Sequence, residues 1–289
     1  MIQYNPKDWF SLIFHRYSRY VIKTLMPILM FMGTFSLGVA YVIIDVLQLD
    51  YNSTVTIHSL LGIVLGLFLV FRTNTAYDRW WEGRKQWGAL VNDSRNFALK
   101  VNAFFGNDDE EHRLFFSKMI PNFVFAMKEH LRAGVDMKDL EEPYEGFNKE
   151  LEQVSHKPNK ITGLMYEKLN AAYKNKLISG DQYFIIDKEL KSLTDILGAC
   201  ERIRNTPIPY SYSMFMKKFI FTFTITLPFG LVTDFNYWTV PIVLIIFYVL
   251  VSIELIAEEI EDPFGRDNND LPTDDLAFKI RNNVKEILK

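Results

Sequence analysis

The side chains that most often carry chemistry are thinly spread in this sequence of 289 residues. No H-x-x-x-H or H-E-x-x-H pair occurs among its five histidines, which are His15, His58, His112, His130 and His156. The sequence also contains no G-x-S-x-G, no G-x-G-x-x-G and no Walker-type phosphate loop. Common forms of nucleophilic catalysis, nucleotide binding and zinc chemistry leave one of these patterns. We therefore expect no enzyme, and we interpret the histidines as surface or interfacial residues.

The segment 258–275, EEIEDPFGRDNNDLPTDD, is rich in the carboxylates that bind calcium. It does not fit an EF-hand loop, because Pro272 stands where the turn glycine is needed and no glutamate closes the loop. Its composition favours a solvated acidic tail over an ion site. The structural alternative is that its acids cap the preceding helix and pair with arginines at a subunit contact; these residues are Glu258, Glu261 and Asp262, with Arg72, Arg79 or Arg202.

Ile63, Leu67 and Phe71 are spaced four apart in an apolar run, so they fall along one face of a helix. Gly62 and Gly66 form a G-x-x-x-G pair on the neighbouring face, which permits another helix to approach closely. The simplest interpretation of this spacing alone is an ordinary lipid-facing or packing stripe.

Four apolar runs, 25–47, 55–71, 219–232 and 238–257, predict four transmembrane helices. The first run is about 34 Å long as a helix, which exceeds a bilayer core of about 30 Å. The last two runs are joined only by residues 233–237, so they must be antiparallel. A soluble bundle is the alternative, but its helices would usually keep a polar face, and the first run has almost none.

Lysine and arginine flank one end of every run, whereas the turns 48–54 and 233–237 contain neither. The positive-inside rule therefore places both termini and the long middle segment in the cytoplasm. No A-x-A cleavage site follows the first run, so we expect no cleaved signal peptide and a bacterial inner (plasma) membrane location.

The chain divides into an interfacial or cytosolic N-terminal helix (1–24), two membrane helices (25–72), a cytosolic helical domain (73–216), two further membrane helices (217–257) and a cytosolic C-terminal segment (258–289). In the middle domain, amphipathic helices are predicted at 112–133, 163–177 and 182–203, and no alternating strand pattern occurs. The fold class is all-α. The net charge is −3, so no cationic field indicates nucleic acid.

A polar pathway inside one subunit is not expected, because four spans leave no room for it and almost no ionisable group lies at mid-membrane depth. If anything crosses the membrane, it must cross at an axis shared between subunits.

Four phrases in the sequence resemble the bestrophin family in its bacterial branch: FRTNTAYDRWWEGRKQWG (71–88), CERIRNTPIPYSY (200–212), TLPFGLV (226–232) and IAEEIEDPFGRDNNDLP (256–272). Their order and spacing match over nearly the whole chain, and 106–176 is the weakest stretch. The resemblance implies a homopentameric ion channel with one axial pore, in which each subunit partners four further copies. Animal members conduct chloride and other anions and open with calcium.

In this family, three apolar residues four apart on the second membrane helix line the neck of the pore. By resemblance these are Ile63, Leu67 and Phe71. Five copies would stack three apolar rings, which would act as a gate that expels water.

The family also has a cytosolic aperture, which falls near Asp181 or Gln182 when counted back from Pro209. Relatives carry an apolar residue there. Five Asp181 carboxylates would attract cations and repel anions, so the resemblance leaves chloride selectivity open.

The calcium clasp of animal bestrophins follows P-F-G as a run of acids. Here Asp267 and Asp270 match two acidic positions, and Glu259 and Asp262 could add carbonyl ligands, which makes calcium a possible cofactor. Arg266 and two asparagines replace acids of that run and lower the local charge.

We therefore expect a pentameric channel that passes small inorganic ions across the lipid bilayer, with anion conduction implied by the resemblance. Two alternatives stay open. One is a cation-preferring channel with an acidic cytosolic aperture, and the other is a non-conducting, membrane-anchored scaffold.

Overall fold

The computed structural model describes residues 16–49, 55–106, 108–132, 134 and 137–289. Every regular secondary-structure element among these residues is a helix, which confirms the all-α prediction. The chain forms two compact units. Of the described residues, those within 16–79, 207–261 and 267–269 form unit 1, and those within 80–206, 262–266 and 270–289 form unit 2.

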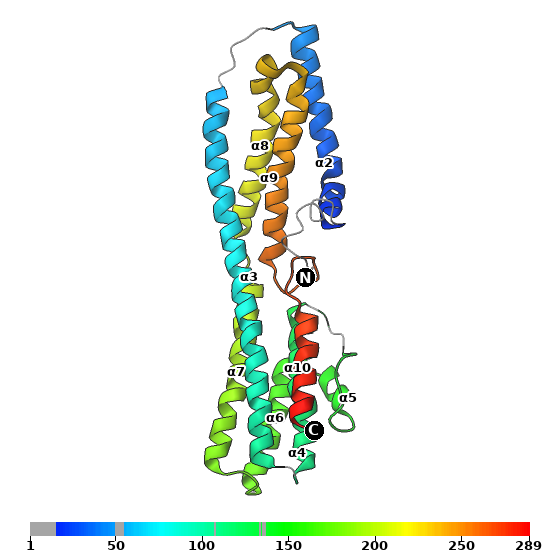
Figure 1. Cartoon of the computed structure of the whole chain (residues 1–289), viewed down its shortest axis with the longest axis vertical. Coiled ribbons are helices and arrows are strands. Elements are labelled where there is room, and N and C mark those ends of the chain that lie inside the picture. The colour runs from blue at the N-terminus through cyan, green and yellow to red at the C-terminus, as the bar shows by residue number, and fades with distance from the viewer. Residues whose placement is uncertain (1–15, 50–54, 107, 133, 135–136) are drawn as a thin grey trace. The chain divides into compact units, whose positions relative to one another are not determined.

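Unit 1 is built from long apolar helices (Figure 1). They are α2 (Arg16–Tyr41), which continues as the π-helical turn η1 (Val42–Val46), the first part of α3 (Val55–Phe105), α8 (Tyr210–Phe235) and α9 (Thr239–Glu261). In the part of the chain that the structure describes, three helical segments are long and apolar enough, by length and composition, to span a membrane: Tyr20–Val46, Val55–Phe105 and Tyr210–Glu261. The 3-10 turn η2 (Asn236–Trp238) divides the last segment into α8 and α9.

The apolar core of unit 1 is small for helices of this length. Met32 of α2, Leu65 of α3, Phe223 of α8 and Val243 of α9 belong to one buried cluster. Only 17% of the most apolar window of α3 is buried, compared with 28% for α2 and 22% for the α8–α9 segment. Most of the apolar surface of each helix, and of α3 above all, is therefore left for lipid or for other copies of the chain.

Unit 2 is a helical bundle around α4 (Glu110–Leu131). This helix packs against α6 (Lys157–Lys174), α7 (Gly180–Asn205) and α10 (Thr273–Ile287). The second part of α3 and the short α5 (Phe147–Glu152) complete the unit. Aromatic and aliphatic side chains fill its core without solvent exposure, among them Trp87, Phe97, Phe116, Phe123, Met165 and Leu190.

Local signals in the sequence explain where these helices start and stop. Helix α3 ends at Phe105 because Gly106 has a φ of 66°, a backbone conformation that glycine adopts without strain. Asp109 then caps α4 by accepting a hydrogen bond of 3.1 Å from the backbone N–H of His112. Ser179 and Gln182 form a reciprocal capping box at the start of α7.

The interpretation of residues 258–275 as a solvated acidic tail is wrong. Leu271 is 2% exposed and Thr273 is 1% exposed, and Thr273 begins α10. Ala277, Ile280 and Val284 then repeat at intervals of three and four residues and bury one face of α10 in the core of unit 2. The high content of acidic residues suggested an exposed tail, although a helix can pack in a core with only one apolar stripe.

Candidate pore-lining face of helix α3

Helix α3 presents one buried face to the rest of unit 1. Leu65, Leu69, Arg72 and Ala76 repeat at intervals of four, three and four residues, and each is at most 3% exposed. With 3.6 residues per turn, this spacing keeps all four side chains on one side of the helix. The buried face fixes how α3 is rotated about its own axis.

Arg72 is the polar centre of this face, and its side chain has no solvent exposure. Its Nε lies 3.4 Å from Oε1 of Glu254, and its Nη2 lies 2.7 Å from Oε2 of Glu261. Farther along, Nε of Arg79 donates a hydrogen bond of 3.0 Å to the backbone carbonyl of Glu261. One guanidinium therefore joins α3 to two carboxylates near the end of α9.

These contacts bear on the structural alternative drawn from the sequence. Glu261 does pair with Arg72, and both residues of this pair belong to one chain. Glu258 pairs with Lys217 at 2.5 Å, not with an arginine. Glu254 was not foreseen as a partner. A charge inside an apolar run is expected to find a partner, and that was the available signal.

Aromatic side chains of α8 support α3 beside the ion pairs. The Tyr212 hydroxyl donates a hydrogen bond of 3.2 Å to the Phe68 carbonyl, and the rings of Phe68 and Phe215 are 5.8 Å apart. A Cβ built on Gly62 would lie 3.5 Å from the Phe223 ring, whereas one on Gly66 meets nothing within 4 Å. Within one chain, only Gly62 of the G-x-x-x-G pair therefore serves a helix contact.

The three residues matched to the family neck lie on the opposite side of α3. Ile63 is 72% exposed, and Leu67 and Phe71 are each 56% exposed. At about 100° per residue, this stripe lies roughly half a turn from the buried face. Three large apolar side chains are thus directed away from the subunit by the same contacts that bury Arg72.

The two residues matched to the cytosolic aperture lie in the first turn of α7. Asp181 is exposed there, whereas Gln182 is half-buried. The Gln182 side-chain oxygen accepts a hydrogen bond of 2.8 Å from the Ser179 backbone N–H, so this amide is engaged in capping. Asp181 is therefore the more available of the two to act on an ion.

The residues matched to a calcium clasp make polar contacts of their own. Nδ2 of Asn269 donates a hydrogen bond of 2.6 Å to the Glu259 carboxylate. The Asp270 carboxylate is buried beside Gly265, where a Cβ would lie 2.7 Å from its Oδ2. Calcium binding by these residues stays a prediction.

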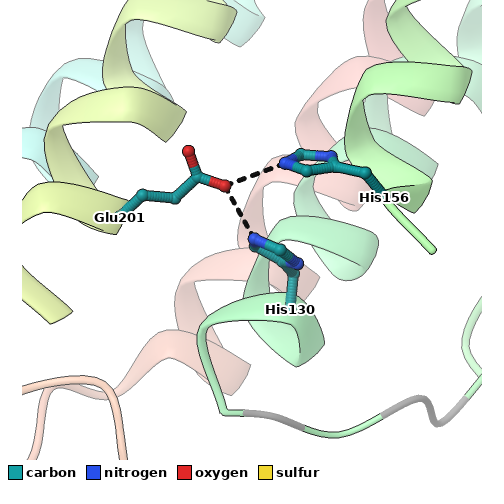
Figure 2. A group of neighbouring side chains, drawn as sticks. All are labelled: His130, His156 and Glu201. Carbon is teal, nitrogen blue, oxygen red and sulfur yellow. Dashed lines mark hydrogen bonds and ion pairs between the residues drawn. The ribbon is translucent and has the colours of Figure 1, made fainter. Parts of the chain in front are cut away.

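One cluster of potential metal ligands in unit 2 was not predicted from the sequence. His130 of α4, His156 at the start of α6 and Glu201 of α7 converge in unit 2 (Figure 2). Nε2 of His130 is 2.7 Å, and Nε2 of His156 is 2.9 Å, from the same oxygen of Glu201. The two histidines are far apart in sequence, so no spacing rule could have paired them.

A family model described as Bacterial/Fungal Bestrophin protein matches residues 1–286. The chain belongs to the bestrophin family. Similarity to proteins named voltage-dependent anion channel-forming protein extends over most of this bestrophin. One from Nostoc sp. is 37% identical over 232 residues, which cover 78% of this chain and 75% of the relative. One from Synechocystis sp. is 31% identical over 290 residues, which cover 99% and 93%.

Solved structures agree with this assignment. A bacterial bestrophin homologue from Klebsiella pneumoniae superposes on this bestrophin with a TM-score of 0.82 and 29% identity, covering 90% of this chain and 97% of the other. A structure described only as a membrane protein gives a TM-score of 0.84 at 28% identity, with coverage of 91% and 98%. The helical fold of the chain is therefore that of solved bestrophins.

Proposed function

We propose that this bestrophin forms a homopentameric anion channel with one axial pore, whose neck is lined by Ile63, Leu67 and Phe71. The observation that carries the proposal is the exposed apolar stripe on α3, directed away from a buried face that is fixed by ion pairs. The names of the relatives support anion passage. The scarcity of buried surface on α3 supports a position against other copies.

The mechanism follows from the chemistry of the stripe. Five subunits around an axis would stack three apolar rings, and an ion that enters such rings must shed water without gaining polar partners. The closed neck is therefore a dry barrier, and opening requires it to widen or to become wet. The ion pairs of Arg72 hold α3 against α9, so a movement of α9 would be passed to the neck.

The proposed location is the bacterial inner membrane with both termini in the cytoplasm. The support is the complete asymmetry of lysine and arginine between the two ends of the membrane helices. In this orientation, the exposed Asp181 at the start of α7 stands in the cytosol, where a ring of carboxylates would oppose anion passage.

Ion flux through purified protein in liposomes tests the proposal. A chloride gradient should give a reversal potential near that of chloride, because the relatives are named as anion channels. A reversal potential of the opposite sign would replace the proposal with the cation-preferring alternative. No flux from correctly assembled protein would favour a membrane-anchored scaffold.

Replacing Ile63, Leu67 and Phe71 together by Ala tests the neck. Smaller side chains widen and wet the rings, so we expect conductance to rise about tenfold, the equivalent of lowering the barrier by ~1.4 kcal/mol. The matched control replaces Ile245 and Val249, which are exposed apolar residues of α9, by Ala. Equal conductance in the triple variant and the wild type would remove the stripe from the gate.

Asp181→Asn tests the aperture. If five carboxylates face the ions, their neutralisation should shift the reversal potential further toward that of chloride. Asp195→Asn is the control, because Asp195 is another exposed acid of α7 that pairs with Lys191 at 2.5 Å. If Asp181→Asn and Asp195→Asn give the same reversal potential, Asp181 does not lie on the ion path.

A further inference from the structure

His130, His156 and Glu201 bring three metal-binding side chains together from three helices of unit 2 (Figure 2). Their ligand atoms all lie within 4.8 Å of one another. Among the described residues, no other group of three or more His, Cys, Asp and Glu ligands is gathered this closely. The two imidazole rings are 4.5 Å apart and tilted by 40°, and both direct a nitrogen at one carboxylate oxygen.

We propose that these three residues form a binding site for one divalent transition-metal ion, with zinc as the best match. Two imidazole nitrogens and one carboxylate oxygen are the ligand types that zinc takes most often besides cysteine. Calcium and magnesium prefer sites made only of oxygen, so this donor set selects against them. Water would complete the tetrahedral coordination.

The two contacts between an imidazole nitrogen and the Glu201 oxygen require only a small adjustment to admit a metal ion. Ligands of a tetrahedral zinc stand about 3.3 Å apart when the metal–ligand bonds are about 2.0 Å long. The nitrogen–oxygen separations are 2.7 Å and 2.9 Å, so each side chain must withdraw by about half an ångström. The three side chains are between 26% and 33% exposed, which leaves them room to move and leaves an ion a way in.

The surroundings supply support and space. A guanidinium nitrogen of Arg204 donates a hydrogen bond of 2.7 Å to the His130 carbonyl and holds the end of α4 in place. A small cavity of about 30 Å³ is lined by His130, Ser155 and Lys157, the last two being the neighbours of His156. This volume is large enough for a water molecule beside the histidines.

Metal binding would change the proton arrangement of His156. Its Nδ1 accepts a hydrogen bond of 3.3 Å from the Asn159 backbone N–H, so the neutral ring carries its proton on Nε2, and this N–H donates a hydrogen bond to Glu201. A metal bound at Nε2 would require the neutral ring to carry its proton on Nδ1, which could then no longer accept the hydrogen bond that caps α6. The lost bond is long and exposed, so water can replace it.

The consequence is a metal-dependent clamp between helices. His130 lies in the last turn of α4, His156 caps α6, and Glu201 lies near the end of α7. An ion bound to all three would stabilise their mutual packing, because it binds the folded arrangement and not the separated helices. The inference does not depend on the channel activity proposed above.

Metal binding by the full-length protein, purified in detergent and stripped with a chelator, tests the proposal. Zinc titrated calorimetrically should bind with a stoichiometry of one per chain, and Co²⁺ should give the visible absorption of a tetrahedral site. Zinc at about a hundred times its Kd should raise the folded-to-unfolded ratio about a hundredfold, which is seen as a higher Tm. A wild-type protein that binds neither ion overturns the proposal.

Two ligand variants identify the site. His156→Asn removes a ligand but keeps a side chain that caps helices well, and Glu201→Gln keeps a hydrogen-bond acceptor for both imidazoles. Each should weaken zinc binding by at least about tenfold, while Asp195→Asn, an exposed acid of the same helix, should leave it unchanged. Unchanged zinc affinity in both ligand variants would place the ion elsewhere and overturn the assignment.

Discussion

One arginine decides which way the exposed apolar stripe of α3 points. Arg72 is fully buried between two glutamates of α9, and Ile63, Leu67 and Phe71 lie on the opposite side of the same helix. A buried guanidinium cannot be released to solvent without loss of both ion pairs. The orientation of an apolar stripe is thus fixed by a polar contact.

Arg72→Met should destabilise the protein by about 3–5 kcal/mol, because it leaves Glu254 buried without its cation. Chemical unfolding in detergent measures this loss. The control is Lys85→Met on the same helix, because Lys85 forms an exposed pair with Glu82 that is worth about 0–1 kcal/mol.

The double variant Arg72→Met with Glu254→Gln separates the ion pair from simple packing. Its loss of unfolding free energy should be smaller than the sum of the losses in the two single variants, because the double variant leaves neither Arg72 nor Glu254 as an unpaired buried charge. Strictly additive losses would mean that Arg72 and Glu254 do not act as a pair.

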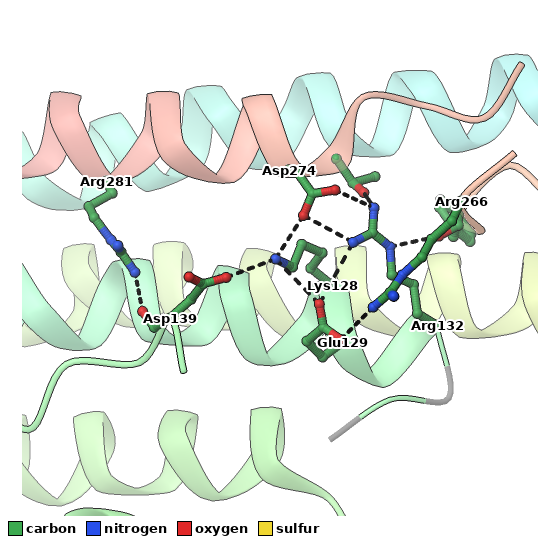
Figure 3. Close-up of polar contacts among 9 residues, drawn as sticks. Lys128, Glu129, Arg132, Asp139, Arg266, Asp274 and Arg281 are labelled. Atoms are coloured by element: carbon green, nitrogen blue, oxygen red, sulfur yellow. Dashed lines mark hydrogen bonds and ion pairs between the residues drawn. The ribbon is translucent and has the colours of Figure 1, made fainter. Parts of the chain in front are cut away.

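At the scale of elements, α10 shows how a polar helix is held in place. Its buried side chains pack on α4, and Asp274 in its first turn receives hydrogen bonds of 3.0 Å and 2.7 Å from Arg132 (Figure 3). Nζ of Lys128 lies 2.9 Å from the same carboxylate. At the other end of the contact, the Arg281 guanidinium lies 4.0 Å from the centre of the Phe125 ring.

This arrangement predicts a pH dependence. Hydrogen bonds from Arg132 outweigh partial burial and, with the help of Lys128, hold the pKa of the Asp274 carboxyl well below its usual range. A lowered pKa in the folded state means that the contribution to stability is present above about pH 4 and declines as pH falls below it. Asp274→Asn should therefore be less stable than wild type at neutral pH, and the difference should narrow in acid.

Chemical unfolding at neutral and acidic pH measures this difference. The Asp274 side chain is 51% exposed, so solvent screens it and the effect should be about 1 kcal/mol or less. Asp195→Asn removes an acid from an exposed ion pair. Its free energy of unfolding should differ from that of the wild type by less than that of Asp274→Asn does at neutral pH. If the difference in unfolding free energy between Asp274→Asn and the wild type stays constant with pH, the charge of Asp274 is not its cause.

At the scale of the whole molecule, a single chain leaves most of the apolar surface of α3 uncovered. The most apolar window of α3 is only 17% buried, and its exposed residues include Ile63, Leu67 and Phe71. A lipid-facing surface and a subunit interface would both cover such a helix. The proposed pentamer assigns the stripe to the axis and leaves the other apolar faces to neighbours and lipid.

The mass of the assembly in mild detergent checks this proposal. We expect native mass spectrometry to find five chains of 33.9 kDa each. A monomer would remove the axis on which the neck depends, and another copy number would require a different number of side chains in each ring.

Accessibility distinguishes the axis from lipid. In a Cys200→Ser background, Leu67→Cys should react with a charged, water-soluble thiol reagent when the channel opens, whereas Ile245→Cys on α9 should not. Equal reactivity at the two exposed positions would contradict an axial location for Leu67.

The sequence by itself determined the long helices other than α10, because burial of a helix in a membrane or a bundle imposes long apolar runs or stripes that are local in the chain. The helix expected at 112–133 overlaps most of α4, and the match of Ile63, Leu67 and Phe71 to the family neck came from the resemblance of the sequence to that family. The acid-rich composition around residue 270 concealed α10, whose apolar stripe is short.

Only the tertiary structure decided the partners. The ion pairs of Arg72 with Glu254 and Glu261, and the meeting of His130 with His156 at Glu201, join residues that are remote in the chain. Such contacts arise from the packing of whole helices, and a local pattern contains no information on which side chains that packing will bring together.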